Sequence, residues 1–164
     1  MARLRAVVVA VLAAASLGGW WLGRSRAGSS HTVRVVHVVD GDTIVVHDGG
    51  GDVTVRLLGV DTPETVDPDE PVQCYGPEAS AFTKAALTGR AVRLETDVER
   101  HDRYGRLLAY VIVDGQRFND ELLRRGYARL LVIPPNGAHS RTMLDEELAA
   151  RRAGTDLWGE CEAR

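Results

Sequence analysis

The chain is 164 residues long, and its formal net charge is −3. Residues 1–27 hold four arginines and no acid, so the remaining 137 residues carry 16 basic and 23 acidic side chains, a net charge of −7. A length of 137 residues suits one domain of ordinary size. The acidic balance argues against tight, non-specific binding to DNA, because proteins of that class present a basic face.

The N-terminal segment predicts export. Residues 6–22 form an uncharged, largely apolar run with two arginines on each side. A basic start before an apolar stretch is typical of a signal peptide or of a signal anchor. As a helix, this run would span roughly 25 Å, slightly less than the roughly 30 Å hydrocarbon core of a membrane. Residues 1–27 are therefore either a cleaved signal peptide of a secreted protein, or an anchor that attaches the protein through residues 6–22 to the outer face of the cell membrane.

Strand patterns follow a short linker, residues 28–31, and open a domain that covers residues 32–164. Three consecutive glycines after the second strand predict a turn, because glycine adopts positive φ at little cost. Apolar residues form short runs, or alternate with polar ones as in half-buried strands, at residues 33–39, 43–46, 53–58, 92–96 and 107–113.

Three helices are predicted between and after these strands. The first begins at Gly76, which is followed by a proline that suits the first turn. Asn119 is predicted to cap the second, which ends before Gly126. The third covers residues 140–151, and its apolar stripe is predicted to be Met143, Leu144 and Leu148. With the five strands, they predict a small, closed or nearly closed β-barrel with helices packed on its flanks.

Two aspartates at strand edges suggest a metal site. Asp42 and Asp61 are nineteen residues apart, and such positions can meet at one rim of a barrel. Carboxylates suit calcium or a similar hard cation, whose other oxygen ligands would be a backbone carbonyl, with Thr62 as the candidate, water and substrate phosphate. Taken singly, each aspartate has an ordinary alternative role, Asp42 in a turn and Asp61 at a bend before Pro63.

Three further side chains complete the pattern. Glu64 is the candidate general base or water-orienting group, since it lies close in sequence to the metal site. Arg56 and Arg106 are candidate phosphate ligands, because the guanidinium fork matches phosphate oxygens. The alternatives are a solvated glutamate, a surface-facing strand arginine at position 56, and an ion pair between Arg106 and Asp102. Together, the carboxylates and arginines indicate metal-assisted cleavage of phosphodiesters.

The histidines and cysteines do not indicate a metal site. The five histidines are scattered without a paired motif, which disfavours zinc. Neither cysteine has a second cysteine or a histidine nearby at ligand spacing. Cys74 and Cys161 are the only cysteines, and outside the cytoplasm such a pair more often forms a disulfide. That bridge would contribute roughly 4–5 kcal/mol by the chain-entropy estimate.

These residues resemble the thermonuclease family, which is typified by staphylococcal nuclease. The resemblance spans nearly the whole of residues 32–164. It implies an α+β fold, namely a five-stranded OB-fold-type β-barrel with three flanking α-helices. The motifs that carry it are Asp40-Gly41-Asp42-Thr43 and residues 56–64, 75–84 and 102–110.

The resemblance also implies an activity and the residues that perform it. Arg56 and Arg106 would hold the phosphate and stabilise its developing charge, and Glu64 would assist the attacking water. Tyr104 would offer a face to the substrate. The expected reaction is hydrolysis of DNA and RNA at the 5′ P–O bond, which leaves 3′-phosphates. Calcium would be bound by Asp42, Asp61 and the carbonyl of Thr62.

A non-catalytic module is the alternative reading of the same barrel. Such a module would bind nucleic acid or protein, but it would not need the whole set of carboxylates and arginines, so the enzyme is favoured. We expect a monomer. The sequence leaves the preference between DNA and RNA open.

Two departures from the family pattern concern substrate affinity. The loop after Glu64 is lysine-rich in the type enzyme, whereas here it is acidic. The type enzyme places tyrosines against the substrate beyond the second helix, where this chain is expected to have Val132 and Pro134. Both changes predict a lower affinity for nucleic acid and leave the catalytic positions untouched. The acidic residues of the loop are Asp67, Asp69 and Glu70.

Overall fold

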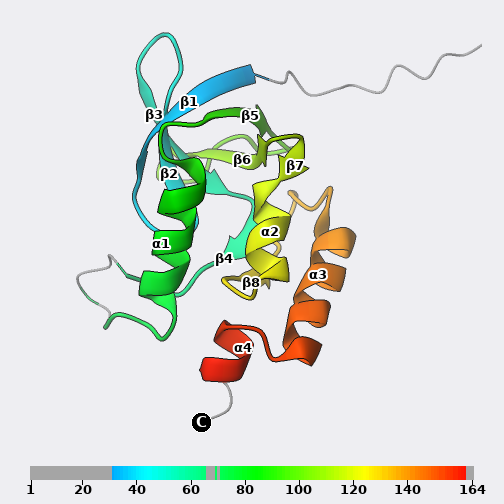
Figure 1. The fold of residues 1–164 in the computed structure, drawn as a ribbon. Helices are drawn as coiled ribbons and strands as arrows, with labels where there is room; N and C mark the ends of the chain where they lie inside the picture. The colour runs from blue at the N-terminus through cyan, green and yellow to red at the C-terminus, as the bar shows by residue number, and fades with distance from the viewer. Residues whose placement is uncertain (1–30, 66–68, 70, 162–164) are drawn as a thin grey trace, which may run out of the picture.

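Five strands close into a barrel (Figure 1). Neighbouring strands pair antiparallel in the order β3-β2-β1-β5-β6, and a parallel pairing of β3 with β6 closes the ring. The structure, a computed structural model, describes residues 31–65, 69 and 71–161, so the predicted signal or anchor segment lies outside the described residues. The barrel strands are β1 (His31–Val38), β2 (Thr43–His47), β3 (Asp52–Leu57), β5 (Ala91–Glu95) and β6 (Leu107–Val113).

The alternation of apolar residues along these strands fills the interior of the barrel. Val35, Ile44, Val46 and Val55 are fully buried, and Tyr110 lies in the same core with 2% of its surface exposed. Burial of apolar surface contributes about 25 cal/mol per Å² to stability, so this core is the main force that holds the barrel closed. All five predicted strands are present, with ends that differ by at most two residues.

A second, smaller sheet was not predicted. It pairs β4 (Gly59–Asp61) antiparallel with β8 (Arg129–Leu131). The short strand β7 (Gln116–Arg117) was not predicted either, and it pairs with β6 in the barrel sheet. Gly59 adopts a φ of +75°, and an added Cβ would lie 2.5 Å from the side chain of Met143, so only glycine fits there. The pairing fixes the backbone that carries Asp61.

Four helices accompany the barrel: α1 (Gly76–Leu87), α2 (Phe118–Arg124), α3 (Ser140–Ala153) and α4 (Leu157–Glu160). Figure 1 shows α1 and α2 side by side against the strands, with α3 beside α2 and the short α4 near the C-terminus. The α+β fold with an OB-type barrel is confirmed, and α4 is an addition to the three expected helices. In the described part of the chain, no helix has both the length and the apolar character needed to cross a membrane.

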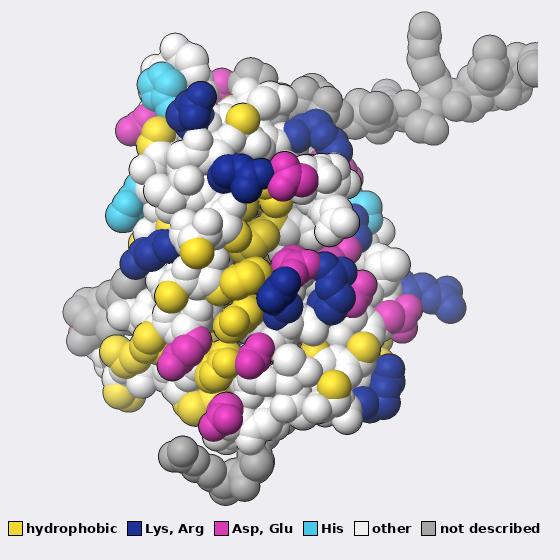
Figure 2. Space-filling view, in the orientation of Figure 1, with side chains coloured by type: hydrophobic (Ala, Val, Ile, Leu, Met, Phe, Trp, Pro, Cys, Tyr) yellow, Lys and Arg dark blue, Asp and Glu magenta, His cyan; other side chains and the backbone are white. Residues whose placement is uncertain are grey.

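Aromatic rings join α1 to α2. The ring of Phe82 stacks on Phe118, with 5.7 Å between ring centres, and on Tyr127, with 4.5 Å. Figure 2 shows a band of hydrophobic side chains between the two helices, with oppositely charged side chains beside it. Arg90 and Asp114, which line the same pocket as Phe82 and Phe118, form an ion pair at 2.7 Å. The stacked rings therefore pack α1 against α2 and against the residue that follows Gly126.

Asn119 is not the cap that was predicted. The helix α2 already begins at Phe118, and Asn119 is fully buried within it. Its Oδ1 accepts a hydrogen bond from the amide of Val111 (2.9 Å), and its Nδ2 donates to the carbonyl of Leu58 (2.8 Å). Asn119 thus pairs the amide of Val111 in β6 with the carbonyl of Leu58, which lies between β3 and β4, and a buried backbone requires such partners. Its contact with Leu58 helps to fix the segment that leads into β4.

The predicted apolar stripe of α3 was partly wrong. Met143 is fully buried, but Leu144 and Leu148 are 41% and 38% exposed. The helix instead turns Glu147 inward, where its Oε1 accepts a hydrogen bond from the amide of Leu130 in β8 (3.1 Å). The need of β8 for a hydrogen-bond acceptor therefore decides which face of α3 is buried.

Candidate active site

The turn between β1 and β2 is held by side chains. The carboxylate of Asp40 accepts hydrogen bonds from the amides of Asp42 (3.0 Å) and Thr43 (2.7 Å). Gly41 has no room for a side chain, since an added Cβ would lie 2.6–2.8 Å from the side-chain atoms of Thr62. These contacts press the turn, and Asp42 with it, against the residue that follows β4.

Asp42 is almost completely buried, with 8% of its side chain exposed. Its Oδ2 accepts hydrogen bonds from the amide (2.8 Å) and the hydroxyl (3.0 Å) of Thr62. Its Oδ1 lies 3.1 Å from Nε of Arg56. A buried carboxylate is tolerated only with such partners. Asp42 therefore ties the β1–β2 turn to β3 and to the backbone after β4.

Arg56 lies at the centre of these contacts and is not the surface-facing residue considered as an alternative. Its side chain is 15% exposed. Nη2 lies 3.1 Å from Oδ1 of Asp61, while Nη1 donates to the carbonyls of Leu57 (2.8 Å) and Val60 (2.7 Å). One guanidinium therefore contacts both Asp42, through Nε, and Asp61, through Nη2, and it links the two predicted metal ligands.

Negative charge exceeds positive charge here. Burial, and then repulsion from Asp42, raise the pKa of Asp40 to about 6. Burial also raises the pKa of Asp61, against the attraction of Arg56 and with a contribution from Asp42. A hard cation fits such a group, because its charge would relieve the repulsion and because it prefers carboxylate and carbonyl oxygens as ligands. Asp42, Asp61 and the Thr62 carbonyl are thus chemically suited to calcium.

The protein supplies only part of a coordination shell. Over residues 31–65, 69 and 71–161, no group of three or more histidine, cysteine, aspartate or glutamate side chains is placed to hold a metal. Two carboxylates and one carbonyl would leave the other positions around a calcium ion to water and to phosphate oxygens. A coordination shell that the protein fills only in part is expected where a metal ion would also contact a substrate.

A second guanidinium is positioned by its own turn. Nε of Arg106 donates to Oδ2 of Asp102 (2.7 Å), so the ion pair that was considered as an alternative is present. Burial raises the pKa of Asp102, but its hydrogen bonds with the side chain and amide of Arg106 and with the amide of Tyr104 outweigh that effect, and the net pKa is lowered. Asp102 therefore stays ionised and orients Arg106 through a hydrogen bond to Nε of the guanidinium.

Arg56 and Arg106 line one pocket of about 530 Å³. Tyr104 also lines it, and 69% of the tyrosine surface is exposed. The guanidinium groups of Arg103 and Arg106 lie 4.7 and 5.5 Å from the centre of the Tyr104 ring. Positive charge beside an apolar wall and an exposed aromatic ring suits a phosphate together with its base.

Apolar side chains from the end of β8 and from the residues after it form one wall of this pocket. Leu131 and Ile133 line it, whereas Val132 and Pro134 do not. Side chains alternate along an extended backbone, so residues 131 and 133 lie on the same side. The correspondence of Val132 and Pro134 with the tyrosines of the type enzyme stays a prediction, and the residues that line the pocket here are also not aromatic.

Glu64 lies beside the carboxylates and outside the lining of this pocket. Its charge contributes to the raised pKa of Asp61. Its Oε1 accepts a hydrogen bond from the amide of Thr65 (2.7 Å). Its own amide donates to Oε1 of Gln73 (3.1 Å), and its carbonyl accepts from the amide of Gln73 (2.9 Å). The structure therefore places Glu64 near Asp61, and Arg56 contacts Asp61 and lines the pocket.

Two residues of the site were not predicted. Asp40 carries a signal in the sequence, because an acid on each side of a glycine suggests a turn whose amides are bound by the first side chain. Gln73 carries no such signal, since its hydrogen bonds with Glu64 reach a residue nine positions earlier. Local patterns do not report contacts of that kind.

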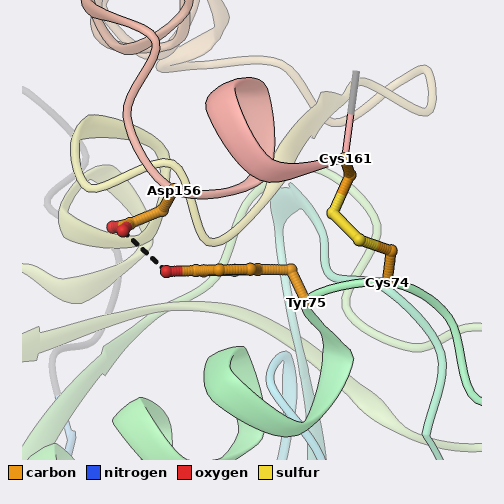
Figure 3. Close-up of a disulfide and its surroundings, with 4 residues drawn as sticks. All are labelled: Cys74, Tyr75, Asp156 and Cys161. Carbon is orange, nitrogen blue, oxygen red and sulfur yellow. Dashed lines mark hydrogen bonds between the residues drawn. A yellow bond between two sulfur atoms is a disulfide. The ribbon is translucent and has the colours of Figure 1, made fainter. Parts of the chain in front are cut away.

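The two cysteines form the predicted disulfide. Their Cα atoms are 6.0 Å apart, and the bridge spans 87 positions in sequence. It joins the backbone just before α1 to the residue that ends α4 (Figure 3). The bridge therefore links the region of Gln73 to the C-terminal end of the described chain.

Comparison with known proteins identifies the family of this chain. The family model described as "Staphylococcal nuclease homologue" matches residues 54–160. A thermonuclease of Staphylococcus hyicus is 44% identical over 136 residues, which cover 83% of this chain and 80% of the relative. A thermonuclease of Staphylococcus intermedius is 46% identical over 131 residues, which cover 80% and 77%. Endonuclease YncB of Bacillus subtilis is 39% identical over 145 residues, which cover 82% and 69%. The chain therefore belongs to the staphylococcal nuclease family.

Proposed function

We propose that the protein is a calcium-dependent nuclease that hydrolyses DNA and RNA at the 5′ P–O bond and leaves 3′-phosphates. The observation that carries the proposal is the position of Arg56, which contacts both Asp42 and Asp61 and also lines the pocket with Arg106. Carboxylates for a cation and arginines for a phosphate are thereby joined in one site. The names of the relatives, thermonuclease and endonuclease, support the same reaction class.

Calcium would be held by Asp42, Asp61 and the carbonyl of Thr62. When bound, it would neutralise charge on the phosphate. Thr62 has two roles in this arrangement, because its amide and hydroxyl also fix Oδ2 of Asp42. The turn at Gly41 packs on its side chain, so the ligands are held in place by contacts within the protein.

The two arginines would bind the scissile phosphate and stabilise the charge that develops on it. All three nitrogens of Arg56 already contact protein oxygens, so its position is set before a substrate arrives. Asp102 fixes Nε of Arg106 in the same way. Fixed donors stabilise a transition state strongly because they do not have to reorganise during the reaction.

Glu64 is the proposed general base for the attacking water. A carboxylate next to Asp61 lies near the proposed cation, and so near a water that the cation would bind. The side chain accepts a hydrogen bond from the amide of Thr65 in this structure. Catalysis therefore requires either its second oxygen or a rotation about its side-chain bonds.

We further propose that the protein acts outside the cytoplasm as a monomer, either secreted or attached to the membrane through residues 6–22. The apolar N-terminal run after two arginines supports export, and so does the disulfide, since disulfides persist in oxidising compartments. The nuclease domain is assigned to residues 32–164.

The activity is tested by incubating the purified protein with plasmid DNA and with RNA, in calcium and in excess chelator. Cleavage is expected in calcium, and it should stop with chelator and return when calcium is restored. End-group analysis of the products should find 3′-phosphates. Equal cleavage in chelator would refute the metal assignment, and binding without cleavage in calcium would favour the non-catalytic module.

A further inference from the structure

We propose that Gln73 is a positioning residue for Glu64, and that the Cys74–Cys161 disulfide holds Gln73 in place, so that turnover depends on the redox state of this bridge. The inference rests on the proposed function, in which Glu64 is the base. Three observations support it. They are the contacts between Gln73 and Glu64, the contacts that anchor the start of α1, and a small pocket that Gln73 and the disulfide line together with Asp61 and Thr62.

Gln73 binds the backbone of Glu64 at both of its polar groups. The side-chain Oε1 of Gln73 accepts from the Glu64 amide (3.1 Å), and the Gln73 amide donates to the Glu64 carbonyl (2.9 Å). The first residue of α1 closes the other side, because a Cβ on Gly76 would lie 3.0 Å from the carbonyl oxygens of Pro63 and Glu64. The position of the proposed base thus depends on Gln73 and on the start of α1.

The start of α1 is itself anchored to the C-terminal segment by two adjacent residues (Figure 3). Cys74 forms the disulfide with Cys161, and the hydroxyl of Tyr75 donates to Oδ1 of Asp156 (2.6 Å). Burial, together with this hydrogen bond, raises the pKa of Tyr75 and keeps the hydroxyl protonated as a donor. Gln73 directly precedes this pair, so a covalent bond lies one residue away from the contact with Glu64.

The disulfide also borders the proposed metal site. A pocket of about 140 Å³ is lined by Asp61 and Thr62, by Gln73, and by both cysteines. Cys74 is exposed, so a reductant in solvent can reach the bridge. Reduction of the disulfide therefore takes place beside Asp61 and Thr62, which would hold the cation, and next to Gln73, which holds Glu64.

The redox step requires an external reductant, and a dithiol supplies it. The dithiol gives two electrons and two protons, the Sγ–Sγ bond breaks, Cys74 and Cys161 become thiols, and the reductant becomes a disulfide. The hydrogen bond between Tyr75 and Asp156 remains as the second anchor. We therefore expect the reduced protein to stay folded while the segment that carries Gln73 moves more freely.

The first test separates positioning from general stability by means of substitutions that leave the disulfide intact. Gln73→Met has a similar shape but no acceptor for the Glu64 amide, so it is expected to lower kcat about 10–100-fold, as small misplacements of catalytic groups do, with little change in KM. Gln73→Glu restores an acceptor oxygen and should recover most of kcat. Gln116→Met is the matched control, because Gln116 is exposed in β7.

A kcat for Gln73→Met within about threefold of the unmodified protein would overturn the proposal. So would a loss that Gln73→Glu does not recover, or one that appears only in KM. Circular dichroism at the assay temperature establishes that each variant is folded. Because Gln73→Met retains the bridge, this arm remains decisive even if cysteine variants do not fold.

The second test compares the oxidised protein, the same protein after treatment with dithiothreitol, and the variant Cys74→Ser/Cys161→Ser. The reduced protein and the double variant are both expected to have a lowered kcat. Reoxidation should restore the kcat of the reduced protein. Dithiothreitol should not change the kcat of the double variant. Equal kcat for oxidised and reduced protein would refute redox dependence. If the oxidised protein fails to cleave nucleic acid in calcium, the proposed function itself fails, and the two failures are thereby distinguished.

Discussion

Nε of Arg56 lies 3.1 Å from Oδ1 of Asp42, and both side chains are largely buried. A buried ion pair is costly to break on one side, because the remaining charge then lacks a partner. The same arginine is a proposed phosphate ligand. Substitutions at this position are therefore expected to affect both catalysis and stability, which distinguishes Arg56 from Arg106.

The first prediction compares Arg56→Lys with Arg106→Lys. Each lysine keeps the charge but loses the planar fork, so each variant should lower kcat by about 10²–10³-fold. Arg56→Lys also leaves the carbonyls of Leu57 and Val60 short of donors, which should cost roughly 1–3 kcal/mol in the free energy of unfolding. The side chain of Arg106 is 33% exposed, so its substitution should cost less than about 1 kcal/mol.

Steady-state kinetics and urea unfolding measure the two effects separately. Arg141→Lys, at an exposed position of α3, serves as the control and should change neither. A change in kcat of less than about threefold in folded Arg56→Lys and Arg106→Lys would contradict the catalytic assignment and favour a binding module.

The second prediction concerns Glu64→Gln. The amide cannot accept a proton from water, so kcat should fall by about 10²–10⁴-fold. Glu64 is not among the proposed cation ligands, and calcium affinity should therefore be largely retained in isothermal titration calorimetry. Asp61→Asn is the matched comparison, because it should lose calcium affinity as well as turnover. Loss of calcium binding in Glu64→Gln would instead place this residue among the ligands.

Much of the fold could be predicted because its signals are local. Apolar alternation located five strands, and the proline after Gly76 located the start of α1 to the residue. The disulfide followed from the presence of only two cysteines. Such features depend on a few adjacent residues or on a count, and the physics that produces them acts over the same short range.

The errors arose where distant backbone groups decide the role of a polar residue. Asn119 has the chemistry of a cap, yet it is buried because Val111 and Leu58 need partners. Glu147 faces inward on α3 because β8 needs an acceptor. In the candidate site, the carboxylates and arginines were predicted from their motif, but the central position of Arg56 depends on how the barrel closes. Tertiary pairing of this kind has no local signature.

The third prediction concerns the acidic loop after Glu64. Asp69 is exposed, and Asp67 and Glu70 lie outside the described residues. Negative charge near the route of a polyanion raises KM and slows association without altering the chemical step. Replacing all three residues with lysine should therefore lower KM at low salt, and the gain should shrink as salt increases, because counterions screen the added charges.

Kinetics over a salt series, with a DNA substrate, measure this effect. The matched control replaces Asp114 with lysine, since Asp114 is exposed and pairs with Arg90 on another face of the barrel, away from the lining of the proposed site. An unchanged KM at every salt concentration would mean that the loop lies clear of the substrate. A change in kcat alone would mean that the loop acts on the site and not on binding.

The last prediction concerns the acid stability that Asp97 confers. Its Oδ2 accepts hydrogen bonds from the amides of Gly137 (2.8 Å) and Ala138 (3.0 Å), and Oδ1 accepts from the amide of Val98 (2.9 Å). Burial raises the pKa of Asp97, but these hydrogen bonds outweigh burial and the net pKa is lowered. Through these hydrogen bonds, the carboxylate holds the residues that follow Ile133 against the end of β5, next to the pocket wall.

The sign of the pH dependence follows from the lowered pKa. A carboxylate with a lower pKa in the folded protein stabilises it above the unfolded pKa of about 3.9, and this stabilisation is lost as the pH falls through the folded pKa. Asp97→Asn should thus cost roughly 1–3 kcal/mol at pH 7, and its unfolding free energy should approach that of the unmodified protein as the pH falls through the lowered pKa of Asp97. Asp114→Asn, whose side chain is 77% exposed in its pair with Arg90, should show a small difference at both pH values. If Asp97→Asn lowers the free energy of unfolding equally at pH 7 and at acid pH, the stabilisation does not depend on the charge of Asp97. Asp97 would then hold the segment as a neutral hydrogen-bond acceptor.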